Sequence, residues 1–167
     1  MMRTFTSLAI VFMLSGCFGP FASFGHNRNL PQADRIIVDK SDRRMWLLKE
    51  GEIIRSYHVD LGFAPVGDKK VQGDGRTPEG VYRIDRRNPR SRYHLSLGIS
   101  YPSRRDIAEA RAMGKNPGGD IFIHGGPRLW KDRNRRDWTD GCIAVTDWQM
   151  SEIYAMVSLD TPIYIRP

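Results

Sequence analysis

The sequence is poor in cysteine and has no long apolar segment. Its two cysteines, Cys17 and Cys142, are too few for a framework of several disulfides. The apolar run near the N-terminus, Leu8–Leu14, is far below the roughly 20 residues that a permanent membrane-spanning helix needs. There is no HExxH motif, and neither His58 nor His94 has a partner at ligand spacing, which argues against a metal site.

Acidic residues are also in deficit. The chain has 19 Asp and Glu against 26 Lys and Arg, which gives a formal charge of +7. That balance suits nucleic acid, an anionic membrane face or a carboxylate-rich substrate, and composition does not choose among the three. The 167 residues, 40% hydrophobic and 27% charged, are enough for one globular domain and too few for two comfortable ones.

The N-terminus has the pattern of an export signal. Arg3 precedes the apolar run and small residues follow it, which predicts a signal peptide over residues 1–16. Leu14-Ser15-Gly16-Cys17 resembles the lipobox of bacterial lipoproteins, which implies a lipid anchor on Cys17 that holds the protein to a membrane. An ordinary cleaved signal with an incidental cysteine is the alternative. Either way we expect a location in the cell envelope, in the periplasm, which argues against nucleic acid as a partner.

Export makes the second cysteine informative. With Cys17 acylated, Cys142 is a lone thiol in an oxidising compartment, where an unpaired cysteine is a liability. It is either a small buried apolar residue or a reactive group. The residues around Cys142 favour the second interpretation.

The remaining chain predicts a tether and one domain. Residues 17–33 are rich in Gly, Pro, Asn and Ser and read as a tether, so the globular domain spans 34–166. Runs typical of strands occur at 35–39, 45–49, 52–61, 81–85, 93–100, 120–124 and 161–165. Capping patterns predict two helices, at 103–113 and 146–158, and a long loop covers 63–80. The expected fold is mainly β, a single α+β domain with two helices.

Two segments carry the chemistry. His124 ends a strand before two glycines, and Cys142 follows Gly141, so a carbonyl could approach the amides there closely. A thiol beside free N–H groups is a plausible nucleophile with an oxyanion pocket, and His124 could take its proton. The carbonyl of Gly125 could orient the other ring nitrogen. Sequence alone does not show that His124 and Cys142 meet.

These residues resemble a known family. His124 followed by Thr139-Asp140-Gly141-Cys142 is similar to the signature of the L,D-transpeptidase (YkuD-like) catalytic domain. Segments 75–84 (GRTPEGVYRI) and 94–102 (HLSLGISYP) resemble two further motifs of that family, so the resemblance covers residues 34–166. It implies a β-sandwich domain that acts on peptidoglycan stem peptides through a thioester on Cys142. Neither a metal nor another cofactor is implied.

The resemblance also implies roles around the nucleophile. Backbone N–H groups of Asp140, Gly141 and Cys142 would hold the oxyanion. Asp140 departs from the family pattern, which has a second histidine there, and Ala144 stands where Arg or Asn is common. A carboxylate facing the thiolate would raise its pKa, so we expect the Asp140 side chain to point away and to be held by amides or by an arginine.

Substrate contacts are predicted on two segments. Tyr93 and His94 are candidates for the lining of the substrate groove. The basic loop before the nucleophile contains Arg128 and Arg136, and arginine binds the carboxylates of stem peptides well. The alternative is a solvated loop whose charges serve solubility.

Three functions follow from these residues. The first is a transpeptidase of cell-wall biogenesis that forms cross-links or attaches a protein. The second is a peptidoglycan hydrolase that uses the same cysteine and histidine with water as acceptor. The third is a wall-binding lipoprotein without catalysis. The sequence does not predict the oligomeric state.

Overall fold

The computed structural model describes residues 30–167. The predicted signal peptide (1–16), the lipobox cysteine Cys17 and most of the predicted tether (17–33) lie outside the described residues. Within residues 30–167 no helix combines the length and the apolar character needed to cross a bilayer.

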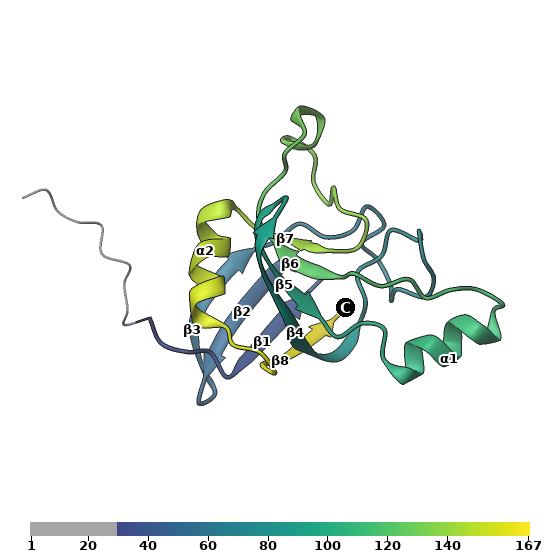
Figure 1. The fold of residues 1–167 in the computed structure, drawn as a ribbon, viewed down its shortest axis with the longest axis horizontal. Coiled ribbons are helices and arrows are strands. Elements are labelled where there is room, and N and C mark those ends of the chain that lie inside the picture. Colours follow the sequence, from purple (N-terminus) through teal and green to yellow (C-terminus); the bar gives the residue numbers. More distant parts are fainter. Residues whose placement is uncertain (1–29) are drawn as a thin grey trace, which may run out of the picture.

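The described part is built around one curled sheet with two α-helices (Figure 1). Its strands are β1 (Arg35–Asp39), β2 (Arg44–Lys49), β3 (Glu52–His58), β4 (Gly80–Ser91), β5 (His94–Ile99), β6 (Phe122–His124), β7 (Ile143–Ala144) and β8 (Pro162–Arg166). They lie in the order β3-β2-β1-β8-β4-β5-β6-β7. The predicted mainly β fold with two helices is confirmed.

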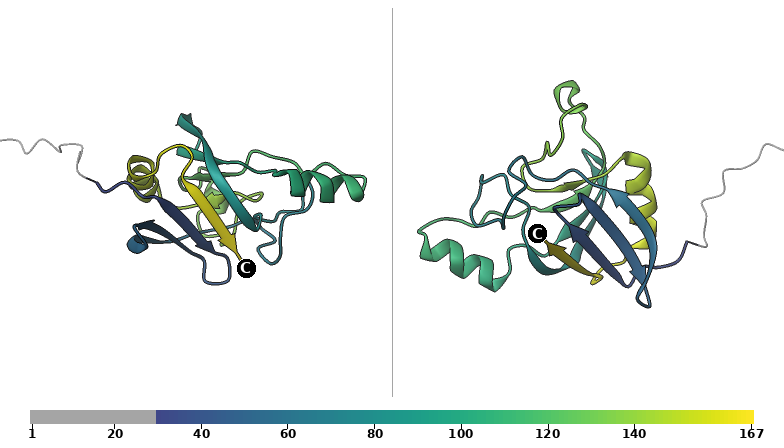
Figure 2. Two further views of the ribbon diagram at one scale, coloured as in Figure 1. Left: turned by 90° about the horizontal axis from the view of Figure 1, so that it is seen from below. Right: turned by 180° about the vertical axis from the view of Figure 1, so that it is seen from behind.

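Strand β4 joins the two halves of the sheet. Its first residues, Gly80–Arg83, pair with β8, and its later residues, from Ile84 on, pair with β5. Because strands in a sheet twist relative to one another, the halves turn toward each other and enclose a common apolar core (Figure 2). The prediction of a strand at 81–85 was too short. The extension to Ser91 is exposed and charged, so it has no apolar alternation that sequence could reveal.

The two helices begin where their capping residues predicted. Helix α1 (Arg104–Ala112) has Ser103 as N-cap, and helix α2 (Asp147–Met156) has Thr146, each with a complete capping box. Helix α2 packs on β5 and β6 and buries Met150, Ile153 and Met156. It starts three residues after β7, so it fixes the end of the segment that contains Cys142.

Candidate active site

The pairing of β6 with β7 brings His124 and Cys142 together. These strands are parallel and lie side by side (Figure 1). His124 is the register partner of Ala144. Cys142 precedes β7 by one residue, so it shares a face with Ala144, two positions on, and therefore with His124. Strand spacing and rise place the two Cα atoms about 8 Å apart. The chain between them, residues 125–141, forms a protruding loop that returns to the sheet.

Glycines make the approach to Cys142 possible. Gly141 has φ +127°, and a Cβ on it would lie 2.6 Å from the carbonyl oxygen of Arg76. Gly62 also lies close, because a Cβ on it would be 2.1 Å from the Gly75 carbonyl oxygen and 2.9 Å from Gly141 Cα. The turn before Cys142 is therefore wedged between two backbone segments of the long loop region.

Thr139 holds this turn through its hydroxyl group. The Oγ1 atom donates to the carbonyl of Cys142 (2.7 Å) and accepts from the N–H of Gly141 (3.2 Å). Its backbone also bonds to Leu61 and Phe63. In this arrangement the Gly141 N–H donates to Thr139, so a role of that group at the oxyanion stays a prediction. Asp140 and Cys142 donate no backbone hydrogen bond to any described residue and remain available.

His124 is buried and oriented by its neighbours. Its Nδ1 lies 2.7 Å from the carbonyl oxygen of Gly125, the acceptor that the sequence suggested. Tyr93 stacks on the imidazole at 4.5 Å between centroids, and Trp138 meets it edge-on at 5.5 Å. Because a carbonyl oxygen only accepts, Nδ1 carries the proton, and a neutral ring then leaves the Nε2 lone pair free.

The environment keeps this ring neutral. Burial lowers the pKa of His124 below its ordinary value of 6.5, and the positive charge of Arg128 acts in the same direction. The hydrogen bond to Gly125 opposes both effects without cancelling them. A neutral imidazole with Nε2 unprotonated is the form of histidine that can act as a base.

Cys142 is also uncharged at rest. Burial raises the pKa of its thiol to about 11, and the negative charges of Asp140 and Asp120 contribute to this rise. The Sγ atom lies 3.6 Å from the carbonyl oxygen of Asp120, to which it donates. Among residues 30–167 the thiol has no hydrogen bond to His124, so the structure contains a thiol and an imidazole, not a preformed ion pair.

Asp140 differs from expectation. Its side chain is exposed and makes no hydrogen bond or ion pair with any described residue. It lies on the pocket that Cys142 lines, where its charge raises the pKa of the thiol. No amide or arginine of the described residues holds Asp140, so the predicted tie is absent, and the direction of its side chain relative to the sulfur stays a prediction. No arginine of residues 30–167 forms an ion pair with Asp140.

A pocket of about 490 Å³ opens over the thiol. Its lining comes from the long loop, from the segment before β6 and from the nucleophile turn: Phe63, Lys69, Gln72, Gly73, Gly118, Gly119, Asp120, Ile121, Asp140 and Cys142. The long loop predicted at 63–80 supplies four of these residues. Lys69 is the cation of this lining, and sequence reasoning did not find it.

The other predicted contact residues lie outside this pocket. Tyr93 covers His124. His94 bonds through Nε2 to Ser151 Oγ at 2.7 Å. Arg128 makes a bidentate pair with Asp147, at 2.8 and 2.9 Å, so its charge is already matched. Arg136 is exposed and has no hydrogen bond with described residues.

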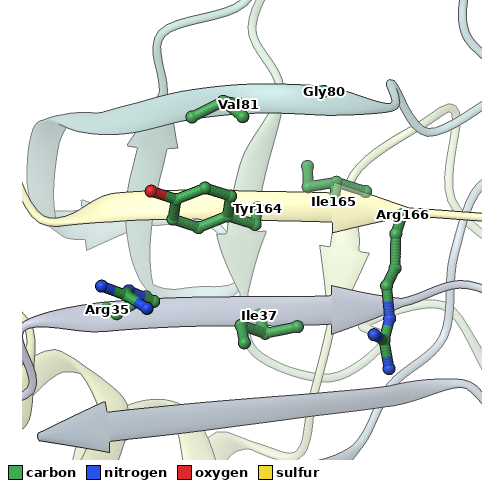
Figure 3. Close-up of a pocket in the computed structure, with 7 residues that line it drawn as sticks. All are labelled: Arg35, Ile37, Gly80, Val81, Tyr164, Ile165 and Arg166. Carbon is green, nitrogen blue, oxygen red and sulfur yellow. The ribbon is translucent and has the colours of Figure 1, made fainter. Parts of the chain in front are cut away.

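Two of the other hollows bear on the site and on the sheet beside it. One, of about 190 Å³, lies at the other end of the β6–β7 pair and is lined by His58, Asp60, Gly126, Trp138, Ala144, Val145, Thr146 and Gln149. The other, of about 440 Å³, lies on the outer face of β1, β8 and β4, where Arg35, Ile37, Val81 and Tyr164 project (Figure 3). It contains neither His124 nor Cys142. No group of three or more His, Cys, Asp or Glu side chains within residues 30–167 is placed to hold a metal ion.

A family model places this geometry in a known class. Residues 33–165 match the L,D-transpeptidase catalytic domain, and the chain belongs to that family. It is 32% identical over 130 residues to the Escherichia coli K12 protein named "Putative L,D-transpeptidase YafK", which covers 74% of this chain and 46% of that protein. The chain thus spans about half the length of the curated relatives it matches.

Solved structures agree on the fold. The helical cell shape determining protein Pgp2 from Campylobacter jejuni is 26% identical with a TM-score of 0.59, over 84% of this chain and 51% of that one. An L,D-transpeptidase from Mycobacterium smegmatis, 14% identical with a TM-score of 0.53, covers 79% of this chain and 58% of its own and supports the fold alone.

Proposed function

We propose that this protein is a peptidoglycan L,D-transpeptidase with Cys142 as nucleophile and His124 as base. The observation that carries the proposal is the shared face of the two residues, with the Nε2 lone pair of His124 free and Nδ1 held by Gly125. The family supplies the class of reaction, and its members act on peptidoglycan stem peptides.

The first half of the reaction forms a thioester. A change of χ1 takes the Cys142 thiol from the Asp120 carbonyl toward His124, whose Nε2 accepts the proton. The thiolate attacks the amide carbonyl that precedes the terminal D-amino acid of a stem peptide. When the C–N bond breaks, the imidazolium of His124 returns its proton to the leaving amine, and the acyl group stays on sulfur.

The second half transfers the acyl group. An acceptor amine attacks the thioester carbonyl, His124 takes the amine proton, and the sulfur leaves as a thiolate that is then reprotonated. In both halves the free N–H of Cys142, with that of Asp140, is the donor we assign to the oxyanion. Thr139 supports this assignment because it fixes the carbonyl of Cys142 and so the plane of the turn.

Transfer is favoured over hydrolysis by the two hollows. The larger pocket lies at the Cys142 end of the β6–β7 pair, and the smaller hollow lies at the Ala144 end, where His124 is the register partner of Ala144. A transferase needs a second binding site so that a positioned amine outcompetes water. We assign the larger pocket to the acyl donor and the smaller hollow to the acceptor.

The test separates the two acceptors. The purified domain is incubated with a tetrapeptide-stem muropeptide and increasing amounts of a D-amino acid or a second stem, and products are followed by mass spectrometry. Transfer predicts a new amide product that grows with acceptor concentration. Release of tripeptide stem at a rate independent of the acceptor would establish a hydrolase instead.

We also propose that the protein acts in the cell envelope and is anchored to a membrane by a lipid on Cys17. The export pattern and the lipobox support this, and several acyl chains would anchor the domain firmly at ~0.8 kcal/mol per buried CH₂. Labelled palmitate should enter the wild-type protein and not Cys17→Ser, and equal labelling of both would contradict the anchor. The similarity to Pgp2 supports a further role in cell shape, which muropeptide profiles and cell images with and without the gene would test.

A further inference from the structure

Two lysines of the domain are buried, and their surroundings differ. The side chains of Lys40 and Lys69 are each 3% exposed. Lys40 uses all three ammonium protons, on the carbonyls of Gly67 and Thr77 and on the carboxylate of Glu79. It therefore holds strands and loops together and has nothing left for a ligand. An ammonium group has three N–H donors, so counting its hydrogen bonds shows whether a donor is left without an acceptor.

Lys69 keeps one donor in reserve. Its ammonium bonds to the carbonyl of Val71 at 3.1 Å and to Asp74 at 2.9 Å. The remaining proton meets no oxygen of the described residues, and the Tyr101 ring is 6.0 Å away at its centroid, at the limit of a cation–π contact. Burying a cation costs free energy unless each of its N–H donors has a hydrogen-bond acceptor, so the Lys69 ammonium can bind an anion.

The positive charge of Lys69 is not cancelled by Asp74. That carboxylate also accepts from the backbone N–H groups of Lys70, Val71 and Arg76, at 2.7, 3.0 and 3.1 Å. Burial raises the pKa of Asp74, but these bonds and the one from Lys69 outweigh it, so the net pKa is lowered. Three amides share the charge of Asp74, which leaves the ammonium with charge to offer elsewhere.

The remaining charges of the pocket are negative. Lys69, Asp120 and Asp140 line the same pocket as Cys142. Asp120 is paired with Arg86 at 3.2 Å, whereas Asp140 has no partner among described residues. An anion that enters this pocket is repelled at Asp140 and attracted at Lys69, and the charge of Lys69 is near enough to lower the pKa of the thiol.

We infer that Lys69 binds the terminal carboxylate of the acyl donor, the one on the D-amino acid that leaves. This inference rests on the proposed function, because that function identifies the acyl donor as a stem peptide. A peptide whose scissile amide lies at Cys142 carries that carboxylate one residue away, in the same pocket. Lys69 is then a specificity-determining residue that selects stems with a free C-terminus.

Binding without turnover tests this assignment. The full chain carrying Cys142→Ala is titrated calorimetrically with a tetrapeptide stem that ends in a carboxylate and with the same stem ending in a carboxamide. The carboxylate form should bind roughly 10- to 100-fold more tightly, as expected for a charge-assisted hydrogen bond. Adding Lys69→Met should abolish the preference, and Lys69→Arg should retain part of it.

The neighbouring lysine is the matched control. Lys70 pairs with Asp68 and Glu109 and does not line the pocket, so Lys70→Met should keep the full preference. Thermal melts establish that each variant is folded. Equal affinity for the two stems, binding of neither, or a preference that survives Lys69→Met in a folded protein would overturn the assignment. Failure of the proposed function is seen separately, as a lack of acyl transfer by the wild-type enzyme.

Discussion

The carboxylate of Asp140 and the thiol of Cys142 line one pocket, and the charge of Asp140 raises the pKa of that thiol. This relationship opposes formation of a thiolate before substrate arrives. A resting thiol is protected in an oxidising compartment, since the thiolate is the reactive form. The deprotonation step then depends on His124, whose neutral ring is ready to accept the proton.

Removing the charge of Asp140 should make Cys142 more reactive. In Asp140→Asn the pKa of the thiol falls, and alkylation by iodoacetamide at pH 8 should be roughly two- to tenfold faster, since one pKa unit is a factor of ten in thiolate. Mass spectrometry of the modified peptide gives the rate. Asp42→Asn removes an exposed carboxylate that does not line the pocket and should leave the rate unchanged. An Asp140→Asn rate equal to that of the wild type contradicts the assigned electrostatics.

The hydroxyl of Thr139 should be required for an ordered nucleophile turn. Thr139→Val keeps the shape but leaves the Gly141 N–H and the Cys142 carbonyl without their partner. We expect a loss of about 2–4 kcal/mol in the free energy of unfolding and a lower kcat. Urea unfolding and acyl-transfer rates measure the two effects. Thr139→Ser retains the hydroxyl and should recover most of both, and a fully active Thr139→Val would remove this role.

Gly141 should be sterically irreplaceable. In Gly141→Ala the new Cβ meets the Arg76 carbonyl in addition to an unfavourable φ, for a cost of about 2–5 kcal/mol in unfolding free energy. Gly51→Ala is the matched control, because Gly51 has φ +88° and nothing within 4 Å of the new Cβ. It should lose only about 1–2 kcal/mol. Similar losses in the two variants would mean that the close approach at Gly141 does not matter.

The Tyr93 ring stacked on His124 should determine the pH at which kcat/KM falls on the acidic side. Burial lowers the pKa of His124, and the base must be neutral, so kcat/KM is retained below pH 6.5 and falls as pH drops through the lowered pKa. Tyr93→Ala uncovers the ring, raises its pKa and moves this limb to higher pH. Tyr164→Ala, on the outer sheet face, should leave the limb in place. An acidic limb at the same pH in Tyr93→Ala as in the wild type would show that the stacked ring does not affect the pKa of His124.

Most of the fold was predictable because it is encoded locally. Capping residues Ser103 and Thr146 marked both helices, and alternation marked most strands. The two-residue strand β7 was missed because it is too short to show a period, although it is what aligns Cys142 with His124. The reactive pair itself was visible from residue type and neighbouring glycines, together with the family resemblance.

The surroundings of the pair were harder to predict. Lys69 lies in a glycine-rich loop, and only the folded loop brings it beside Cys142. Arg128 has the right chemistry for a carboxylate, but its charge is taken by Asp147 from the start of α2, a contact between distant parts of the chain. Whether an arginine pairs with Asp140 depends on how the loop folds, and residue spacing does not determine that.

Trapping the acyl-enzyme shows whether Cys142 is the nucleophile. Wild-type protein is mixed with a tetrapeptide-stem muropeptide, quenched in acid within the first turnover and measured by intact-protein mass spectrometry. We expect a mass increase equal to the stem without its terminal D-amino acid, located by peptide mapping on Cys142 and absent from Cys142→Ala. Product formation without such an adduct, or an adduct that persists in Cys142→Ala, would contradict the assignment of Cys142 as the nucleophile.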